Sequence, residues 1–436
     1  IRTFQCKGAL CAAFDWRRAV ARFFACAAFA RKAKRMRGFE GKGVVVDLLN
    51  QKKGLLAVGV VAGAMLALLA YFGNPANMAM CAACFIRDTA GALKLHSASV
   101  VQYFRPEVVG LVVGAFVIAL ATKEYRSTAG SSPMIRFVLG FIMMIGALVF
   151  LGCPLRMVIR MSAGDLNAYV GLIGLVLGIA TGTLFLKKGY SLGRERDTNK
   201  SAGAVLPLAL AALMIIGLIA GVFAASETGP GSKHAPVLIA LAASLVVGML
   251  AQKARICFAG GVRNVMLMRD FDLLLPIAGL FVVMLVYNLV TGNFKLSFEG
   301  QPIAHSQHLW NILGLYAVGF AAVLAGGCPL RQMTLAGQGS CDAAVTFLGM
   351  LIGAAIAARV CERVHMAGAA ASAATAEAAA VAGGPALAGQ IVLVGCIAVL
   401  FVIGAVNLRS KQKSAGIAAA SSASASVEDA SAAAAN

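Results

Sequence analysis

The sequence predicts an all-α polytopic membrane protein with about ten transmembrane helices, arranged as two inverted repeats that contain short re-entrant helices. Its composition is 60% apolar and 13% charged, with a mean hydropathy of +0.84, whereas soluble domains carry about 25% charged residues. Apolar stretches of about 15–22 residues recur along the chain, which is the length of helix that crosses about 30 Å of hydrocarbon. A cysteine pattern also occurs twice at nearly the same spacing, which indicates an internal duplication.

Each predicted span is an apolar stretch bounded by polar, basic or glycine-containing segments. The spans that begin at Glu107 and Pro236 are the shortest. We expect transmembrane helices near residues 54–72, 107–121, 134–152, 166–187, 204–225, 236–251, 272–292, 308–327, 342–360 and 389–407.

The net charge of +20 would suggest a nucleic-acid partner in a soluble protein, but here the basic residues collect in alternate loops. The loops at 226–235 and 293–307 carry one lysine each. By the positive-inside rule, the basic loops are cytoplasmic and both termini lie inside, so we expect no nucleic-acid partner. The basic segments are 31–53, 123–136, 187–200, 253–269 and 409–413.

The duplicated pattern consists of a Cys-Phe pair followed by a Gly-Cys-Pro-Leu-Arg motif. Cys84 precedes Cys153 by 69 residues, and Cys257 precedes Cys328 by 71 residues. Each copy contains four predicted spans, and the single span near 204–225 separates the copies. Because an odd number of inserted spans reverses the second copy, we expect inverted repeats with two cysteine segments entering from each face.

The first 35 residues have the composition of a transit peptide, and a translation artefact with a start at Met36 is the alternative interpretation. The Ala-rich segments near the C-terminus are typical of a flexible loop and a disordered tail. The predicted organisation is a basic N-terminal extension (1–43), a first repeat (44–200), a linking helix (201–228), a second repeat (229–361), an Ala-rich loop (362–388), a final transmembrane helix (389–408) and a tail (409–436).

Four cysteine-bearing segments are too short and too polar to span, so we expect them to fold back into the membrane, where irregular backbone is tolerated beside a watery cavity. Proline after Cys153 and after Cys328 would break the preceding helix. Short helices that start at these breaks direct positive N-termini inward, and Arg156 and Arg331 add fixed charge. The pathway therefore favours an anion. The segments are 76–93, 153–165, 255–270 and 328–342.

The repeated cysteines are better explained by function than by packing, because packing needs neither duplicated spacing nor flanking proline and arginine. Cys361 and Cys396 have no repeat partner and are interpreted as packing residues. The candidate pathway residues are Cys84, Cys153, Cys257, Cys328, Arg156, Arg331 and Cys341.

Cys81 and Cys84 form a C-x-x-C motif, which is typical of redox chemistry or of half a metal site. When Cys84 is matched to Cys257, however, Ala254 occupies the place of Cys81. We therefore expect no metal and no cofactor at this motif.

His305 and His308 are separated like paired metal ligands, but a solvated loop is the expected environment for both. Asp165 and Asp342 follow the two Gly-Cys-Pro motifs and are expected to cap the next helices, with a role in holding the arginines as the alternative. No phosphate-binding glycine-rich loop followed by Lys-Ser/Thr occurs in the sequence, so ATP coupling within this chain is not expected.

The Cys-Phe-Ile-Arg-Asp run at 84–88, the two Gly-Cys-Pro-Leu-Arg motifs and the Gly-Gln-Gly-Ser-Cys run at 337–341 resemble the YeeE/YedE family of sulfur-compound transporters, and most closely its YedE branch, associated with bacterial selenium metabolism. The resemblance covers residues 44–360. It implies inverted repeats, re-entrant helices and an hourglass shape, with cysteines that pass an anion by S–H to sulfur contacts. Family transporters of thiosulfate use three central cysteines, whereas this chain offers four or five, so a selenium compound is the alternative substrate.

We therefore expect a transporter or channel of the bacterial inner membrane, not an enzyme, that imports a small sulfur- or selenium-bearing anion along a cysteine-lined pathway. Its partners would be this anion, the lipid bilayer and a cytoplasmic sulfurtransferase-like protein. Two alternatives stay open: a membrane thiol–disulfide oxidoreductase that uses Cys81 and Cys84, and a membrane anchor for a soluble sulfur- or selenium-transfer protein.

Overall fold

The computed structural model describes residues 52–75, 77–193, 195–369 and 384–408, with side chains up to 358 and from 384 onward. The predicted N-terminal extension and tail, and most of the Ala-rich loop, lie outside these residues. Within the described ranges, ten helices are long and apolar enough to cross a membrane, which confirms the predicted all-α class and span number.

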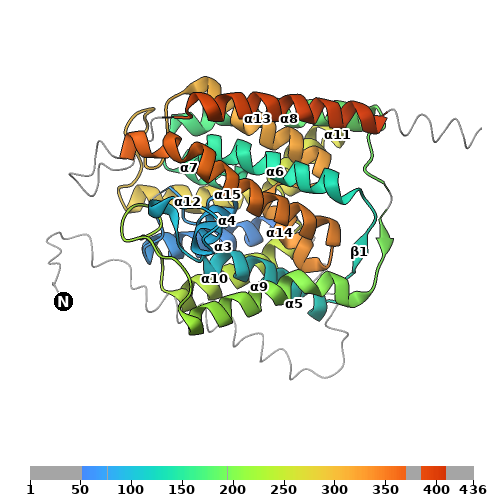
Figure 1. The fold of residues 1–436 in the computed structure, drawn as a ribbon, viewed down its shortest axis with the longest axis horizontal. Coiled ribbons are helices and arrows are strands. Elements are labelled where there is room, and N and C mark those ends of the chain that lie inside the picture. Colours follow the sequence, from blue (N-terminus) through green and yellow to red (C-terminus); the bar gives the residue numbers. More distant parts are fainter. Residues whose placement is uncertain (1–51, 76, 194, 370–383, 409–436) are drawn as a thin grey trace, which may run out of the picture. The chain divides into compact units, whose positions relative to one another are not determined.

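The first half of the chain contains long helices interrupted by two short ones (Figure 1). The short helices α4 and α7 each carry repeated cysteines in or immediately before their first turn. The elements are α3 (Lys52–Tyr71), α4 (Ala82–Ala92), the 3-10 turn η2 (Ser99–Val101), α5 (Pro106–Ala121), β1 (Thr128–Ala129), α6 (Pro133–Val149), α7 (Pro154–Ser162), α8 (Leu166–Lys187) and β2 (Arg196–Asp197).

The second half repeats this order after the linking helix α9 (Lys200–Ala220). Helix α15 continues to Ala369, so it includes the first residues of the segment predicted as an Ala-rich loop. The elements are α10 (Val237–Lys253), α11 (Phe258–Met268), the 3-10 turn η3 (Asp272–Leu274), α12 (Leu275–Val290), α13 (His308–Ala325), α14 (Pro329–Gln338), α15 (Cys341–Ala369) and a last apolar helix at Leu387–Leu408.

The Gly-Cys-Pro motifs end helices, as predicted. Helix α6 stops before the first motif, where Leu151 adopts a left-handed φ of 65°, and α7 restarts at Pro154. Helix α13 ends at Gly326, with φ of 84°, and α14 restarts at Pro329. Proline is favourable at the first position of a helix because its missing N–H would have no partner there. The restarts therefore follow directly from the local sequence.

Contacts between a helix of the first half and a helix of the second half occur in pairs, in which the equivalent helices of the two halves exchange places. Helix α3 packs on α12 as α10 packs on α5, and α8 packs on α13 as α15 packs on α6. The short helices follow the same rule, because α4 contacts α14 and α7 contacts α11. Glycines allow this close approach: a Cβ at Gly174 would lie 2.0 Å from the Ile312 carbonyl oxygen, and one at Gly178 would lie 2.1 Å from that of Tyr316. These glycines therefore form a close helix-packing face on α8.

The basic loops lie together at one end of the helices. The loop at 122–132 and the loop at 188–199 pair through β1 and β2, which lie at the right of Figure 1. Lys253, at the end of α10, forms an ion pair of 2.5 Å with Glu124 in the first of these loops. The loops with few basic residues meet one another elsewhere, where Ser226 N–H donates to the Gln102 carbonyl at 2.7 Å. The charge pattern therefore sorts the loops into the two groups predicted from the sequence.

Candidate functional site

Two pairs of thiols are the main feature of the site. Cys81 Sγ lies 3.8 Å from Cys153 Sγ, and Cys257 Sγ lies 3.9 Å from Cys328 Sγ. All four side chains are buried, and none forms a disulfide. We call Cys81 and Cys153 the first thiol pair, and Cys257 and Cys328 the second thiol pair.

Each of the four thiols sits at the N-terminus of a short helix. Cys81 caps α4 by accepting the Cys84 backbone N–H at 3.3 Å, and Cys257 caps α11 by accepting the Gly260 N–H at 3.1 Å. Cys153 and Cys328 occupy the equivalent cap positions of α7 and α14, each followed by proline. The positive ends of four helices therefore gather around the sulfur atoms, which favours an anion there.

The structure corrects the register of the duplication. Cys81, not Cys84, is the counterpart of Cys257, because these two residues cap the equivalent helices and meet the equivalent Cys-Pro cysteines. The match of Cys81 to Ala254 was therefore wrong. The sequence contains a signal for the correct register. Five residues separate Cys81 from an Arg-Asp pair, and five residues separate Cys257 from an Arg-Asn pair.

Cys84 lies one turn inside α4, beside the first thiol pair rather than in it. Its Sγ is 3.4 Å from Nη1 of Arg156 and 3.9 Å from the carbonyl oxygen of Leu151. It therefore contacts the arginine of the first Gly-Cys-Pro-Leu-Arg motif.

Arg156 is fully buried and holds three separate backbone segments together. Nε donates to the Asn77 carbonyl at 3.0 Å, Nη2 donates to the Ile303 carbonyl at 3.1 Å, and Nη1 donates to the Leu151 carbonyl. No carboxylate lies within ion-pair distance of Arg156 among the residues that the structure describes. A buried guanidinium with only neutral partners is costly, and an anion nearby offsets that cost.

Arg331, the counterpart of Arg156, is held less tightly and is partly exposed. Its hydrogen bonds to described residues come from Nη1 alone, which donates to Gln252 Oε1 at 3.1 Å and to Thr334 Oγ1 at 3.4 Å. The described residues supply no carboxylate to Arg331 either. The cation beside the second thiol pair, Arg331, therefore has N–H groups without a partner among the described residues. All three nitrogens of the cation beside the first pair, Arg156, donate to backbone carbonyls.

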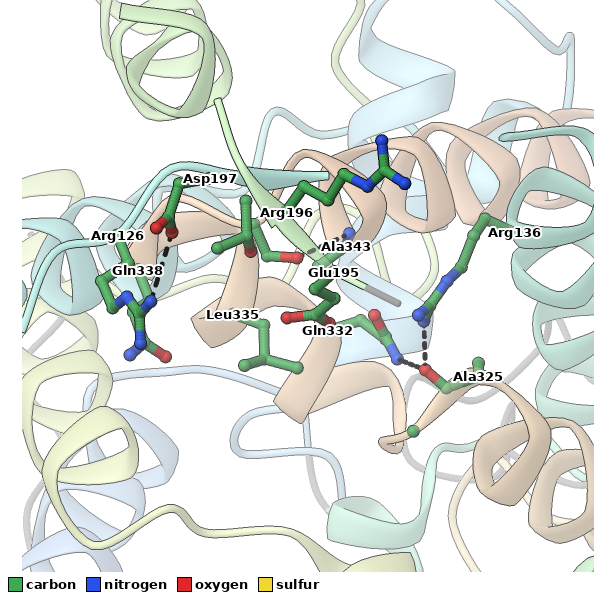
Figure 2. Close-up of a pocket in the computed structure, with 13 residues that line it drawn as sticks. Arg126, Arg136, Glu195, Arg196, Asp197, Ala325, Gln332, Leu335, Gln338 and Ala343 are labelled. Atoms are coloured by element: carbon green, nitrogen blue, oxygen red, sulfur yellow. Dashed lines mark hydrogen bonds and ion pairs between the residues drawn. The ribbon is translucent and has the colours of Figure 1, made fainter. Parts of the chain in front are cut away.

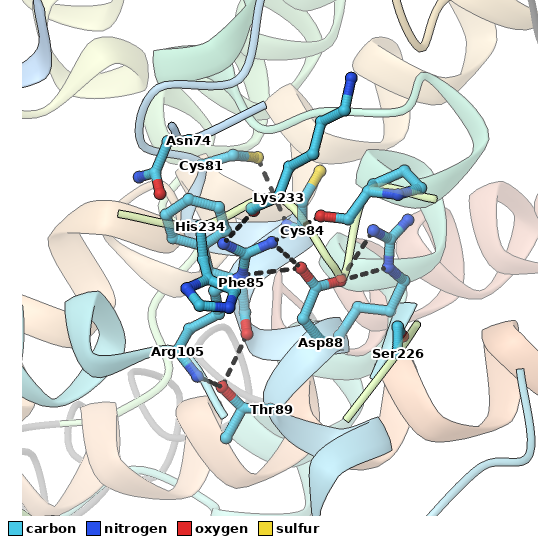
Figure 3. Close-up of polar contacts among 12 residues, drawn as sticks. Asn74, Cys81, Cys84, Phe85, Asp88, Thr89, Arg105, Ser226, Lys233 and His234 are labelled. Atoms are coloured by element: carbon cyan, nitrogen blue, oxygen red, sulfur yellow. Dashed lines mark hydrogen bonds and ion pairs between the residues drawn. The ribbon is translucent and has the colours of Figure 1, made fainter. Parts of the chain in front are cut away.

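A buried charge cluster next to the first thiol pair was missed from the sequence (Figure 3). Asp88 accepts from Nη2 of Arg87 at 2.8 Å and from Nε of Arg105 at 2.9 Å. The Arg105 guanidinium also lies 4.5 Å from the centre of the Phe85 ring. Two arginines on one aspartate leave this three-residue cluster with a net positive charge beside α4. The signal for it was present, because Arg87 and Asp88 belong to the run that carries the family resemblance.

The two aspartates after the Gly-Cys-Pro motifs differ in role. Asp165 caps α8 by accepting the Asn167 N–H at 2.9 Å, as predicted, and it also forms a buried ion pair with Arg160 at 2.6 Å. Asp342 lies in the first turn of α15 and accepts from the Ser131 hydroxyl at 2.5 Å. The second capping prediction is therefore wrong: the hydroxyl of Ser340 accepts the Ala343 N–H at 3.3 Å instead.

The remaining candidates lie apart from the thiol pairs. Cys341 begins α15, is partly exposed, and makes no sulfur–sulfur contact with the other described cysteines. Cys396 is buried in the last described helix, and the side chain of Cys361 lies outside the described residues. His308 is exposed as expected, but His305 is buried and lies 2.8 Å from the Val149 carbonyl oxygen. Burial lowers the pKa of His305 to about 4.

A cavity of about 710 Å³ opens at the end where the basic loops gather (Figure 2). Its lining contains three arginines, two acidic residues and Gln332, which is fully buried. The cavity also touches Ala325 and Gly326, which lead directly to Cys328. The charged lining residues are Arg126, Arg136, Arg196, Glu195 and Asp197.

Residues 253–433 match a family model described as sulphur transport, Sulf_transp. The matched segment contains the second thiol pair and Arg331, and it confirms the resemblance to YeeE/YedE proteins at the level of the family. No curated protein matches the chain. The family match and the ten apolar helices together indicate a membrane transporter of sulfur compounds.

Proposed function

We propose that the protein conducts a small sulfur- or selenium-bearing anion across the bacterial inner membrane through its two thiol pairs. The observation that carries this proposal is the duplicated site: two close thiol pairs at the N-termini of short helices, each beside an arginine with no carboxylate partner among the described residues. The two copies are inverted relative to each other, so that one pair faces each side of the membrane.

The path begins at the first thiol pair, where four features attract a negative charge. These are the helix N-termini of α4 and α7, the Arg156 guanidinium, and the surplus positive charge of the Arg87–Asp88–Arg105 cluster. The anion then passes to the second thiol pair and leaves beside Arg331 toward the basic loops, which face the cytoplasm.

Thiols suit such a path because they bind weakly. A protonated thiol is a weak hydrogen-bond donor, and its sulfur is polarisable enough to contact another sulfur or selenium atom. Conduction requires each site to bind the ion strongly enough to admit it and weakly enough to release it. The Sγ–Sγ separations of 3.8 and 3.9 Å leave each pair unbonded, with its thiols available to the anion.

The test is uptake of radiolabelled thiosulfate and of radiolabelled selenite into proteoliposomes that contain wild type or Cys328→Ser. Cys396→Ser is the matched control, because Cys396 is buried but has no thiol contact among the described residues. We expect uptake of at least one anion that falls about fivefold or more in Cys328→Ser and is unchanged in the control. Equal uptake by all three proteins would reject the thiol pathway, and no uptake of either anion would reject transport of these substrates.

A thiol–disulfide oxidoreductase is the second candidate, because each pair is close enough to form a disulfide after a small movement. It would use the Cys81–Cys153 and Cys257–Cys328 pairs, not the C-x-x-C pair of Cys81 and Cys84. Mass spectrometry of the protein alkylated as isolated distinguishes the two functions, since turnover by an oxidoreductase leaves a fraction of these pairs oxidised.

A further inference from the structure

The cavity at the basic loops contains an unpaired hydrogen-bond acceptor. The amide nitrogen of Gln332 donates to the carbonyl oxygens of Ala325 at 3.0 Å and Gly327 at 3.2 Å. Because both partners can only accept, the orientation of the amide is fixed, and Oε1 must point away from them. No described residue donates to this oxygen, although the side chain is fully buried (Figure 2).

The surroundings of this acceptor contain three guanidinium groups. Arg136 donates to the same Ala325 carbonyl at 2.5 Å and to the Ser131 hydroxyl at 2.7 Å, which fixes its guanidinium at the cavity wall. Arg126 and Arg196 line the cavity as well, together with the carboxylates of Glu195 and Asp197. Arg136 also forms an ion pair of 3.8 Å with Asp342, and Arg126 forms one of 3.2 Å with Asp197. Arginine guanidinium groups are well suited to bind oxyanions. The cavity therefore combines guanidinium donors with a buried oxygen that requires a donor.

We propose that this cavity binds an anion that still carries an ionisable hydrogen, such as hydrogen selenite, in preference to an anion that carries none, such as thiosulfate. The guanidinium groups of the arginines can donate hydrogen bonds to either kind of anion. Only the first kind can donate to Gln332 Oε1, whereas the second places an oxygen lone pair against it and leaves the buried acceptor unpaired. This inference rests on the proposed transport, which brings the anion from Cys328 to the cavity. It names the class of anion that the cavity selects.

The position of Gln332 supports a selective role. Gly327, whose carbonyl it binds, directly precedes Cys328, so the side chain lies beside the backbone that leads from the cavity lining to the second thiol pair. In the first copy the equivalent residue after Gly-Cys-Pro-Leu-Arg is Met157, which has no strong acceptor. The acceptor is therefore a feature of one side of the pathway only.

The experiment compares matched anions in equilibrium binding to the purified protein near neutral pH. Selenite and selenate contain the same element, and phosphate and sulfate share a tetrahedral shape, but only the first of each couple carries a hydrogen at this pH. We expect wild type to bind selenite over selenate, and phosphate over sulfate, by about tenfold. Gln332→Met, which copies the first repeat, should bring both ratios close to one. Gln338→Met is the control, because Gln338 lines the same cavity and donates through Nε2 to the Glu124 carbonyl at 3.4 Å.

Equal affinities within both couples for wild type would overturn the inference, since a bound water would then satisfy Oε1. A preference for hydrogen-bearing anions that persists in Gln332→Met would overturn the inference too. If this variant fails to fold, the comparison of anions in wild type alone decides the test. Binding is measured without transport, so failure of the two proposals can be told apart. A preference for hydrogen-bearing anions in a protein that takes up neither label would reject the proposed transport and leave this site standing.

Discussion

Cys81 shows how one residue decides which thiols act together. Its Sγ meets Cys153, and it accepts the backbone N–H of Cys84 at the start of α4. Cys84 instead faces Arg156 from inside the helix. The sequence offers two cysteines at this place, and the phenylalanine that follows both Cys84 and Cys257 favours the wrong match. The position at which α4 begins decides which of the two cysteines caps the helix, and helix boundaries are the feature that a sequence predicts least well.

The first prediction separates these two cysteines. Cys81→Ala should lower the initial rate of anion uptake about fivefold or more, because it removes one member of the first thiol pair and the cap of α4. Cys84→Ala should change the rate less than about twofold, since Arg156 keeps its three backbone carbonyl partners. Uptake into proteoliposomes measures both. A larger loss in Cys84→Ala than in Cys81→Ala would show that the sequence register was the functional one.

His305 gives a prediction about stability and pH. Its ring is buried, and burial lowers its pKa to about 4 from an ordinary value near 6.5. The folded protein therefore prefers neutral His305, so its contribution is complete above about pH 6.5 and is lost as the pH falls toward 4. The loss amounts to at most about 3 kcal/mol. We expect the thermal midpoint in detergent to fall over this window in wild type.

His305→Gln should reduce this pH dependence, because glutamine can still donate to the Val149 carbonyl but does not titrate. His308→Gln is the matched control, since His308 is exposed three residues away. An unchanged midpoint–pH curve in His305→Gln, measured by differential scanning fluorimetry, would contradict the assignment.

At the scale of elements, the sequence predicts the breaks but not all of their supports. Proline after Cys153 and Cys328 makes the helix restarts predictable, and both occur where expected. The groups that satisfy the freed carbonyls were not predictable, because the two breaks use different side chains at different distances from the repeated cysteine. Arg160 donates to the Phe150 carbonyl at 3.0 Å in the first break, and the Gln332 amide donates to the Ala325 carbonyl at 3.0 Å in the second. The repeated motif does not reveal these partners, because Arg160 follows Cys153 by seven residues whereas Gln332 follows Cys328 by four.

The Arg160–Asp165 ion pair gives the prediction at this scale. Both side chains are fully buried, so Asp165→Asn, which keeps a cap for α8, should destabilise the protein by about 3–5 kcal/mol by leaving a buried charge unpaired. The second copy has Leu335 and Ser340 at the equivalent positions. The double variant Arg160→Leu with Asp165→Ser should therefore recover much of the loss.

The measurement is urea or thermal unfolding of the two variants and wild type in the same detergent. If the double variant is no more stable than Asp165→Asn, the ion pair supports the site through its hydrogen bonds rather than through charge balance. The Phe150 carbonyl, which loses its donor in the double variant, is the group that would account for that outcome.

At the scale of the whole chain, charge and periodicity predicted the ten spans and the grouping of loops. They could not show how the halves meet, because each contact between repeats joins residues far apart in sequence. The matched contacts of α3 with α12 and of α10 with α5 express the duplication in three dimensions. The inversion of the copies that we propose would add a direction to this match, and that direction depends on which side of the membrane each loop group faces.

The last prediction tests that direction. Ser191 is exposed in a basic loop, and Glu227 is exposed in the loop group on the other side. The positive-inside rule places Ser191 in the cytoplasm and Glu227 outside. A membrane-impermeant maleimide should therefore label Glu227→Cys in intact cells, and Ser191→Cys only after the cells are opened. Wild type, treated in the same way, measures the background from native cysteines such as Cys341. Labelling of both introduced cysteines in intact cells would place both loop groups on one side, which the inverted arrangement does not allow.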